Sequence, residues 1–210
     1  MAASTLLQTL ANLLRPELCQ QPATIWLRER SHGKEGDLAS VTLHKKGPAV
    51  VLKLDGFTPR RCSRLNCECT FSADDRFFPL FQAVAGVRAI CDYIIFYQWP
   101  RERTDASGPL YVFLCELKSR NTGGSGGQIE NGKLLADYII SMAKYHGENP
   151  VDQRIVYRGL LFSSNVRPPK TAIEHKPVRY ENRSRRLADL KLIHYPCGSE
   201  WALSHFCDER

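Results

Sequence analysis

The sequence predicts an α/β domain with a mixed central β-sheet flanked by helices, one on each side. Two continuous apolar runs at residues 90–97 and 110–118 are rich in β-branched and aromatic residues, which is typical of neighbouring central strands. A long helical pattern follows at about 128–146, and a further β-like run at 154–162. Because no internal repeat or linker interrupts this order, we expect a single domain over residues 1–210.

The N-terminal part begins with leucines at helical spacing, which predict an amphipathic helix over about residues 4–15: Leu6, Leu7, Leu10, Leu13 and Leu14. Pro16 ends this pattern, because proline disfavours helix in the residue before it. We expect the apolar face to pack on the domain's own sheet. The alternative is that it contacts a second copy, a partner protein or a membrane surface.

The core is expected to span about residues 20–165, and shorter patterns within it and after it predict further strands and a helical turn. Strands are predicted at 24–27, 41–43, 49–54 and 192–195, and a terminal helical turn at 201–207. In the long helix, one face is expected to include Gln128 and Gly132, followed by Leu135, Ile139 and Met142. That face should pack against the sheet.

The net charge of +7 is concentrated in one window of the sequence. From Arg154 to Lys191 there are ten Lys and Arg and three acidic residues, a surplus of seven. This basic C-terminal region, about 154–210, predicts contact with phosphates through a surface loop or short helix that carries Arg179, Arg183, Arg185 and Arg186. A solvated charged face is the alternative.

The cellular setting is expected to be the cytoplasm. No run approaches the roughly 20 apolar residues needed to cross a bilayer, and the N-terminus lacks a secretory signal. The eight cysteines are therefore interpreted as reduced thiols or metal ligands. The alternative is a structural zinc or iron–sulfur site formed by Cys62, Cys67 and Cys69, with Cys197 or Cys207 as the fourth ligand. This site is not favoured, because the spacing of the first three cysteines is not a standard one for such metals.

Charged residues interrupt both apolar strands. Asp92 lies in the first strand, and Glu116 and Lys118 project from one face of the second. If the strands pair, these side chains meet at one end of the sheet, where two carboxylates could bind Mg²⁺ or Mn²⁺. Lys118 could then orient a water or stabilise negative charge on phosphorus. The alternative is structural: Lys118 neutralises Glu116, and Asp92 caps a loop.

This arrangement resembles the PD-(D/E)xK nuclease superfamily, which has the restriction-endonuclease-like fold. The resemblance covers about residues 90–140 and implies that Asp92, Glu116 and the backbone carbonyl of Leu117 hold the metal. It further implies that Lys118 assists the attacking water and that Gln128, at the start of the next helix, contributes to the site.

The match departs from the family pattern at three points, one of which is the spacing from Gln128 to Tyr138, wider than the Gln-x-x-x-Tyr pattern of the recombination-nuclease branch. Cys91 precedes Asp92 where the family commonly has proline. Many members also place an acid on an earlier helix near the metal, for which Glu68 is the candidate.

The expected function is metal-dependent hydrolysis of phosphodiester bonds, with DNA favoured over RNA. A first alternative is a non-catalytic module of the same fold, acting as a partner subunit in a larger nucleic-acid-processing or defence complex. A second is nucleotide binding, because Gly127 to Lys133 is one residue from a Walker A motif. Leu134 stands where that motif needs Ser or Thr, so residues 123–127 are instead expected to form a flexible loop before a helix.

Overall fold

The computed structural model describes residues 5–15, 19–20, 23–29, 39–54, 87, 89–99, 108–119, 123–147, 153–164, 182–183, 187 and 190–207 of the 210-residue chain. Its helices are α1 (Leu6–Leu13), α2 (Ser125–His146) and the short 3-10 helix η2 (Leu203–Phe206). Its strands are β1 (Cys19–Gln20), β2 (Thr24–Arg28), β3 (Ser40–His44), β4 (Ala49–Lys53), β5 (Tyr93–Gln98), β6 (Leu110–Lys118), β7 (Ile155–Ser163), β8 (Asn182–Arg183), β9 (Lys191–Pro196) and β10 (Glu200–Ala202).

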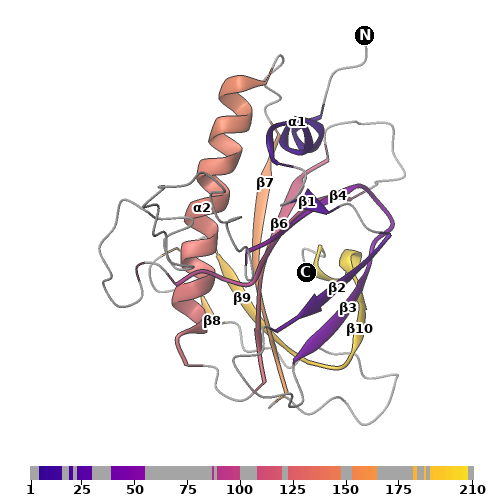
Figure 1. The fold of residues 1–210 in the computed structure, drawn as a ribbon, viewed down its shortest axis with the longest axis vertical. Coiled ribbons are helices and arrows are strands. Elements are labelled where there is room, and N and C mark those ends of the chain that lie inside the picture. Colours follow the sequence, from indigo (N-terminus) through magenta and orange to yellow (C-terminus); the bar gives the residue numbers. More distant parts are fainter. Residues whose placement is uncertain are drawn as a thin grey trace, which may run out of the picture.

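The strands form two mixed sheets (Figure 1). The larger has the order β1-β4-β5-β6-β7-β9-β8, in which β4, β5 and β6 are antiparallel neighbours and β6, β7 and β9 are parallel. The smaller has the order β10-β3-β2, with β10 parallel and β2 antiparallel to β3. The prediction of a mixed α/β chain is therefore confirmed, including the pairing of the two central strands.

The two faces of β6 belong to different hydrophobic layers, because side chains alternate along a strand. Leu110, Val112 and Leu114 pack with residues of α1 and α2. The alternate residues, such as Phe113 and Leu117, pack with the inner face of the smaller sheet and with η2. The described residues differ from the prediction of a helix on each side: the two α-helices among them cover one face, and the smaller sheet with η2 covers the other.

Helix α1 packs on its own domain. Thr5 caps its N-terminus, its side chain accepting a hydrogen bond from the amide of Gln8, and the leucines that face inward are buried beside residues of β4, β5 and α2: Leu6, Leu7 and Leu10. Only Leu13, of the leucines within the helix, is exposed. The apolar face is therefore occupied, and the alternative of α1 as a contact for a partner has no support.

Helix α2 presents a different face to the sheet from the one expected. Its buried residues are mostly small, with Gly132 and Ala136 between Ile129 and Ile140, and Ala143 after Ile140. Met142 is exposed instead, and Leu135 and Ile139 are only partly buried, so the predicted stripe is wrong in part. Small residues face the sheet because the helix lies close to it. A Cβ atom on Gly132 would lie 2.4 Å from the Sγ of Cys91 and 3.6 Å from Leu114.

The start of α2 also differs from the prediction. Gly124, with a φ of 80°, precedes the first helical residue, and a positive φ is a conformation that glycine adopts without strain. Residues 125–127, expected to form a flexible loop, are already helical. In the described residues, no helix has both the length and the apolar character required to span a membrane.

The contact between Gly132 and Cys91 gives a test of this packing. We expect Gly132→Ala to destabilise the protein by about 1–3 kcal/mol, because the added methyl overpacks the interface between α2 and the sheet. The measurement is urea denaturation followed by circular dichroism.

The control is Gly127→Ala in the same helix, where an added Cβ meets no atom within 4 Å. The free energy of unfolding of this variant should equal that of wild type or exceed it by up to about 1 kcal/mol, because alanine has a higher helix propensity than glycine. Adding Cys91→Ala to Gly132→Ala should recover part of the loss. Equal stability of the two single glycine variants would contradict the packing described.

Candidate active site at the carboxyl end of strand β6

Three of the residues predicted to form a site meet where β6 ends. Glu116 and Lys118 close this strand, and Asp92 lies directly before β5. The antiparallel register pairs Tyr93 with Cys115, so the segment before β5 runs beside the end of β6. The ends of the parallel strands β6 and β7 also meet at this edge, and carboxyl ends of strands are where ligands commonly bind in α/β folds.

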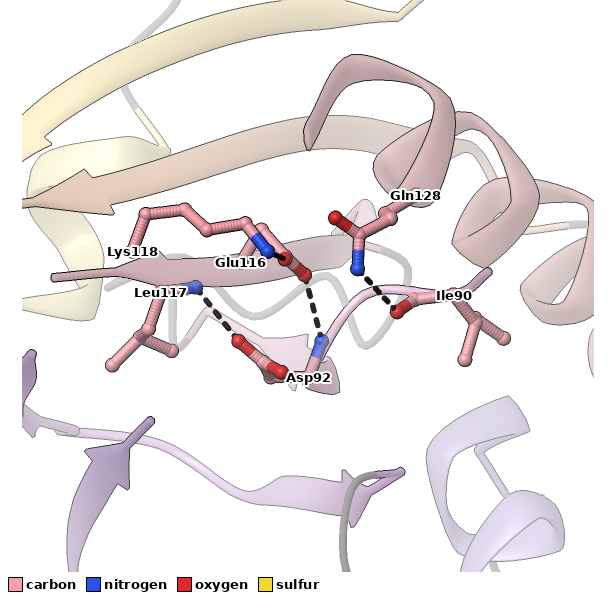
Figure 2. Close-up of polar contacts among 6 residues, drawn as sticks. All are labelled: Ile90, Asp92, Glu116, Leu117, Lys118 and Gln128. Atoms are coloured by element: carbon pink, nitrogen blue, oxygen red, sulfur yellow. Dashed lines mark hydrogen bonds and ion pairs between the residues drawn. The ribbon is translucent and has the colours of Figure 1, made fainter. Parts of the chain in front are cut away.

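Two hydrogen bonds, each between a carboxylate and a backbone amide, connect the segment of Asp92 with the end of β6 (Figure 2). The amide of Leu117 donates to Asp92 Oδ2 at 2.8 Å, and the amide of Asp92 donates to Glu116 Oε2 at 3.2 Å. Each carboxylate is therefore bound to the strand that carries the other. Lys118 Nζ lies 2.6 Å from Glu116 Oε1 and completes the group.

Glu116 is completely buried, whereas the side chain of Lys118 is 22% exposed. Burial raises the pKa of Glu116 above its ordinary value of 4.5, because a charged carboxylate loses its hydration there. The hydrogen bond and positive charge of Lys118 and the amide of Asp92 oppose that shift without cancelling it, and the negative charge of Glu29 adds to it. The site therefore holds a carboxylate whose charge is only partly compensated.

Gln128 lies in the first turn of α2 and holds the segment before β5 in place. Its side-chain amide donates to the carbonyl of Ile90 at 3.3 Å, and the amide of Cys91 donates to the carbonyl of Gln128 at 3.1 Å. Figure 2 shows its side chain directed at Ile90 rather than at the carboxylates. Gln128 therefore acts as a positioning residue for Asp92 in this structure.

The backbone carbonyl of Leu117 faces the same side of β6 as Asp92. The carbonyl of Lys118 accepts a hydrogen bond from Ser164, on the side of β7. In a strand, the amide and carbonyl of one residue point to the same side, and those of the next residue to the other. Since the amide of Leu117 bonds to Asp92, its carbonyl faces the side of Asp92 as well.

Glu29 is an acidic residue of this region that the sequence did not single out. It directly follows β2, and the preceding residue, Arg28, exchanges hydrogen bonds of 3.2 Å through its amide and carbonyl with the hydroxyl of Tyr93. Its charge is close enough to raise the pKa of Glu116. Glu68, the acid predicted for this role, lies outside the described residues, and those residues contain no cluster of three or more metal-ligating side chains.

Of the four arginines predicted to contact phosphates, the structure describes one, Arg183. Arg179, Arg185 and Arg186 lie outside the described residues. Arg183 belongs to strand β8, where its backbone pairs with Lys191, so the expected loop or short helix is wrong at this position. Arg158, from the same basic window, is buried and donates to the carbonyl of Tyr157.

Four cysteines in the described part of the chain are free thiols: Cys91, Cys115, Cys197 and Cys207. Burial raises the pKa of both Cys91 and Cys115, and raises that of Cys197 to about 11. Cys207 is buried in the layer beneath the smaller sheet. The three predicted core ligands of a zinc or iron–sulfur site lie outside the described residues: Cys62, Cys67 and Cys69.

The phosphate-loop interpretation is wrong, because the whole segment from Gly127 to Lys133 lies inside α2. Lys133 is buried on the sheet side, where its Nζ lies 2.8 Å from Asp137 and 4.4 Å from the ring centre of Tyr157. The hydroxyl of Tyr157 also donates to Asp137. Lys133 therefore forms part of the contact between α2 and β7.

The raised pKa of Glu116 predicts how stability varies with pH. Well below pH 4.5, the ordinary pKa of the group, the carboxyl is protonated in both folded and unfolded chains. As the pH rises towards the folded pKa, the unfolded chain loses its proton first, so the free energy of unfolding falls. Glu116→Gln cannot titrate, so this variant should gain stability relative to wild type as the pH rises through that window.

Urea denaturation of both proteins across a pH series measures this difference. A difference in stability that stays constant with pH, or that moves in favour of wild type as the pH rises, would contradict the cost of burial assigned to Glu116.

Comparison of the chain with protein-family models, with curated proteins and with solved structures gives no match. Function is therefore inferred from the geometry of the site.

Proposed function

We propose that the protein is a metal-dependent nuclease that hydrolyses phosphodiester bonds, with DNA as the favoured substrate and the cytoplasm as its setting. The observation that carries this proposal is the convergence of Asp92, Glu116 and Lys118 at one end of the central sheet. These are the residues on which the resemblance to PD-(D/E)xK nucleases depends. The succession β6, α2, parallel β7 and the antiparallel pairing of β5 with β6 support a restriction-endonuclease-like core.

The donors at this edge suit a hard divalent cation. Asp92 and Glu116 supply carboxylate oxygens and Leu117 a carbonyl oxygen, and Mg²⁺ and Mn²⁺ prefer such ligands. The buried charge of Glu116 is only partly compensated by Lys118, so a cation would stabilise it further. When bound, the metal would polarise a phosphate and lower the pKa of a bound water.

Other residues would position the metal-binding carboxylates and neutralise the negative charge of the substrate. The side chain of Lys118 is partly exposed, so its ammonium can reach both Glu116 and a substrate phosphate or water. Gln128 holds the segment before β5 and thereby the carboxylate of Asp92. The surplus of positive charge in the chain favours a polyanionic substrate, since lysine and arginine side chains bind phosphates.

A non-catalytic module of the same fold is the second candidate, and one observation favours it. Glu116 has no exposed surface, and its two oxygens already contact Lys118 and the amide of Asp92. A buried ion pair of this kind can be purely structural. Under this alternative the protein would bind a partner or nucleic acid as a subunit of a larger complex, without cleavage.

The first test is cleavage by purified variants. We expect Asp92→Asn, Glu116→Gln and Lys118→Met each to reduce Mg²⁺- or Mn²⁺-dependent hydrolysis at least about 100-fold, because each removes a group in contact with metal, water or phosphate. Plasmid and labelled oligonucleotides are suitable substrates, with EDTA as the reference. Glu200→Gln, which alters an exposed carboxylate paired with His44, should keep the wild-type rate. Retained cleavage by folded Glu116→Gln would refute the mechanism.

The second test separates the two candidates without using activity. A cation that binds only the folded protein stabilises it, by about 2.7 kcal/mol when its concentration is 100 times the dissociation constant. We expect Mg²⁺ or Mn²⁺ to raise the melting temperature of wild type at constant ionic strength, and to have no such effect on Asp92→Asn. No effect on wild type would favour the non-catalytic module.

A further inference from the structure

Helix α2 carries large apolar side chains on the side that faces away from the sheet. The exposed fractions are 54% for Leu134, 62% for Tyr138, 38% for Met142 and 82% for Tyr145. These residues follow one another at intervals of four, four and three, so they form one stripe along the helix. The opposite side, from Ile129 to Ala143, is the one buried on the sheet.

This stripe differs from the scattered apolar residues of an ordinary surface. A helix that packs on one sheet normally carries charged and polar residues on its outer face. Here the outer face repeats the spacing used for contacts between helices, in which side chains three and four residues apart interlock with a second helix. The leucine face of α1 cannot supply that helix within the chain, because it is already buried.

We propose that this stripe binds the same stripe of a second copy of the chain, with the two α2 helices antiparallel. Three of the four residues of the stripe are symmetric about Tyr138, since Leu134 lies four residues before it and Met142 four residues after it. In a twofold contact residue i meets residue j and j meets i. Leu134 of each copy therefore packs on Met142 of the other, and the two Tyr138 rings meet near the axis.

Charges beside the stripe obey the same symmetry. Glu130 and Lys144 lie on one side of the stripe, because fourteen residues are close to four helical turns. Their midpoint is within one residue of Tyr138. An antiparallel pair thus brings Glu130 of each copy to Lys144 of the other, twice in the dimer, whereas a parallel pair would leave these two residues about 21 Å apart along the helix axis. This complementarity within one face identifies a second copy, in antiparallel orientation, as the occupant.

Analytical ultracentrifugation of the full chain over a range of concentrations tests the proposal. Wild type should form a dimer. Leu134→Glu should raise the dissociation constant of this dimer at least about tenfold, since a charge would be buried in the contact. The matched control is Leu13→Glu, which changes a leucine of similar exposure, 47%, on α1 and should leave the dimer intact.

A charge reversal makes the test specific for the antiparallel register. Glu130→Lys and Lys144→Glu should each weaken the dimer, and the double variant should restore it, since both cross-contacts are then again of opposite charge. Circular dichroism checks that each variant is folded.

Three outcomes would overturn the proposal. These are a monomeric wild type, a double variant that dimerises no better than the single ones, and a control Leu13→Glu that dissociates like Leu134→Glu. A monomer in which Leu134→Glu lowers the melting temperature would show that the chain itself covers the stripe.

Discussion

The burial of the Glu116 carboxylate is the main constraint on the described core, because no part of this side chain is exposed to water. An ionised carboxylate in that position is unfavourable by several kcal/mol unless opposite charge and hydrogen bonds surround it. Lys118 provides the charge, and the amide of Asp92 provides a hydrogen bond. The second contact requires the observed pairing of Tyr93 with Cys115, because this register places the segment before β5 beside Glu116.

The layers on the two faces of the larger sheet hold this register in place. On the helical face, Gln128 binds Ile90 and Cys91 just before Asp92, and Gly132 lets α2 approach closely enough to make these contacts. On the other face, the end of β2 is bonded to the hydroxyl of Tyr93. The segment that carries Asp92 is thus fixed from both sides, which is the support that a site with defined geometry requires.

Local patterns in the sequence predicted the two central strands, β5 and β6, and the meeting of Asp92, Glu116 and Lys118 at their adjacent ends. The apolar runs were long enough to identify β5 and β6, and Glu116 and Lys118 stood out because charge is rare in such runs. The inward face of α2 was not predicted, because its small residues, such as Gly132 and Ala136, give a weaker signal than large apolar ones. Glu29 could not be predicted either, since its proximity to Glu116 depends on packing between two sheets, which no local pattern encodes.

The proposed nuclease activity requires that Asp92 and Glu116 form a site for a divalent cation rather than a closed structural ion pair. Anomalous diffraction from a crystal soaked in Mn²⁺ tests this most directly, because manganese is detected by its own scattering. We expect an anomalous peak within coordinating distance of both carboxylates and of the carbonyl of Leu117, with Lys118 displaced from its 2.6 Å contact with Glu116. The absence of a peak there at saturating Mn²⁺, with that contact intact, would contradict the claim.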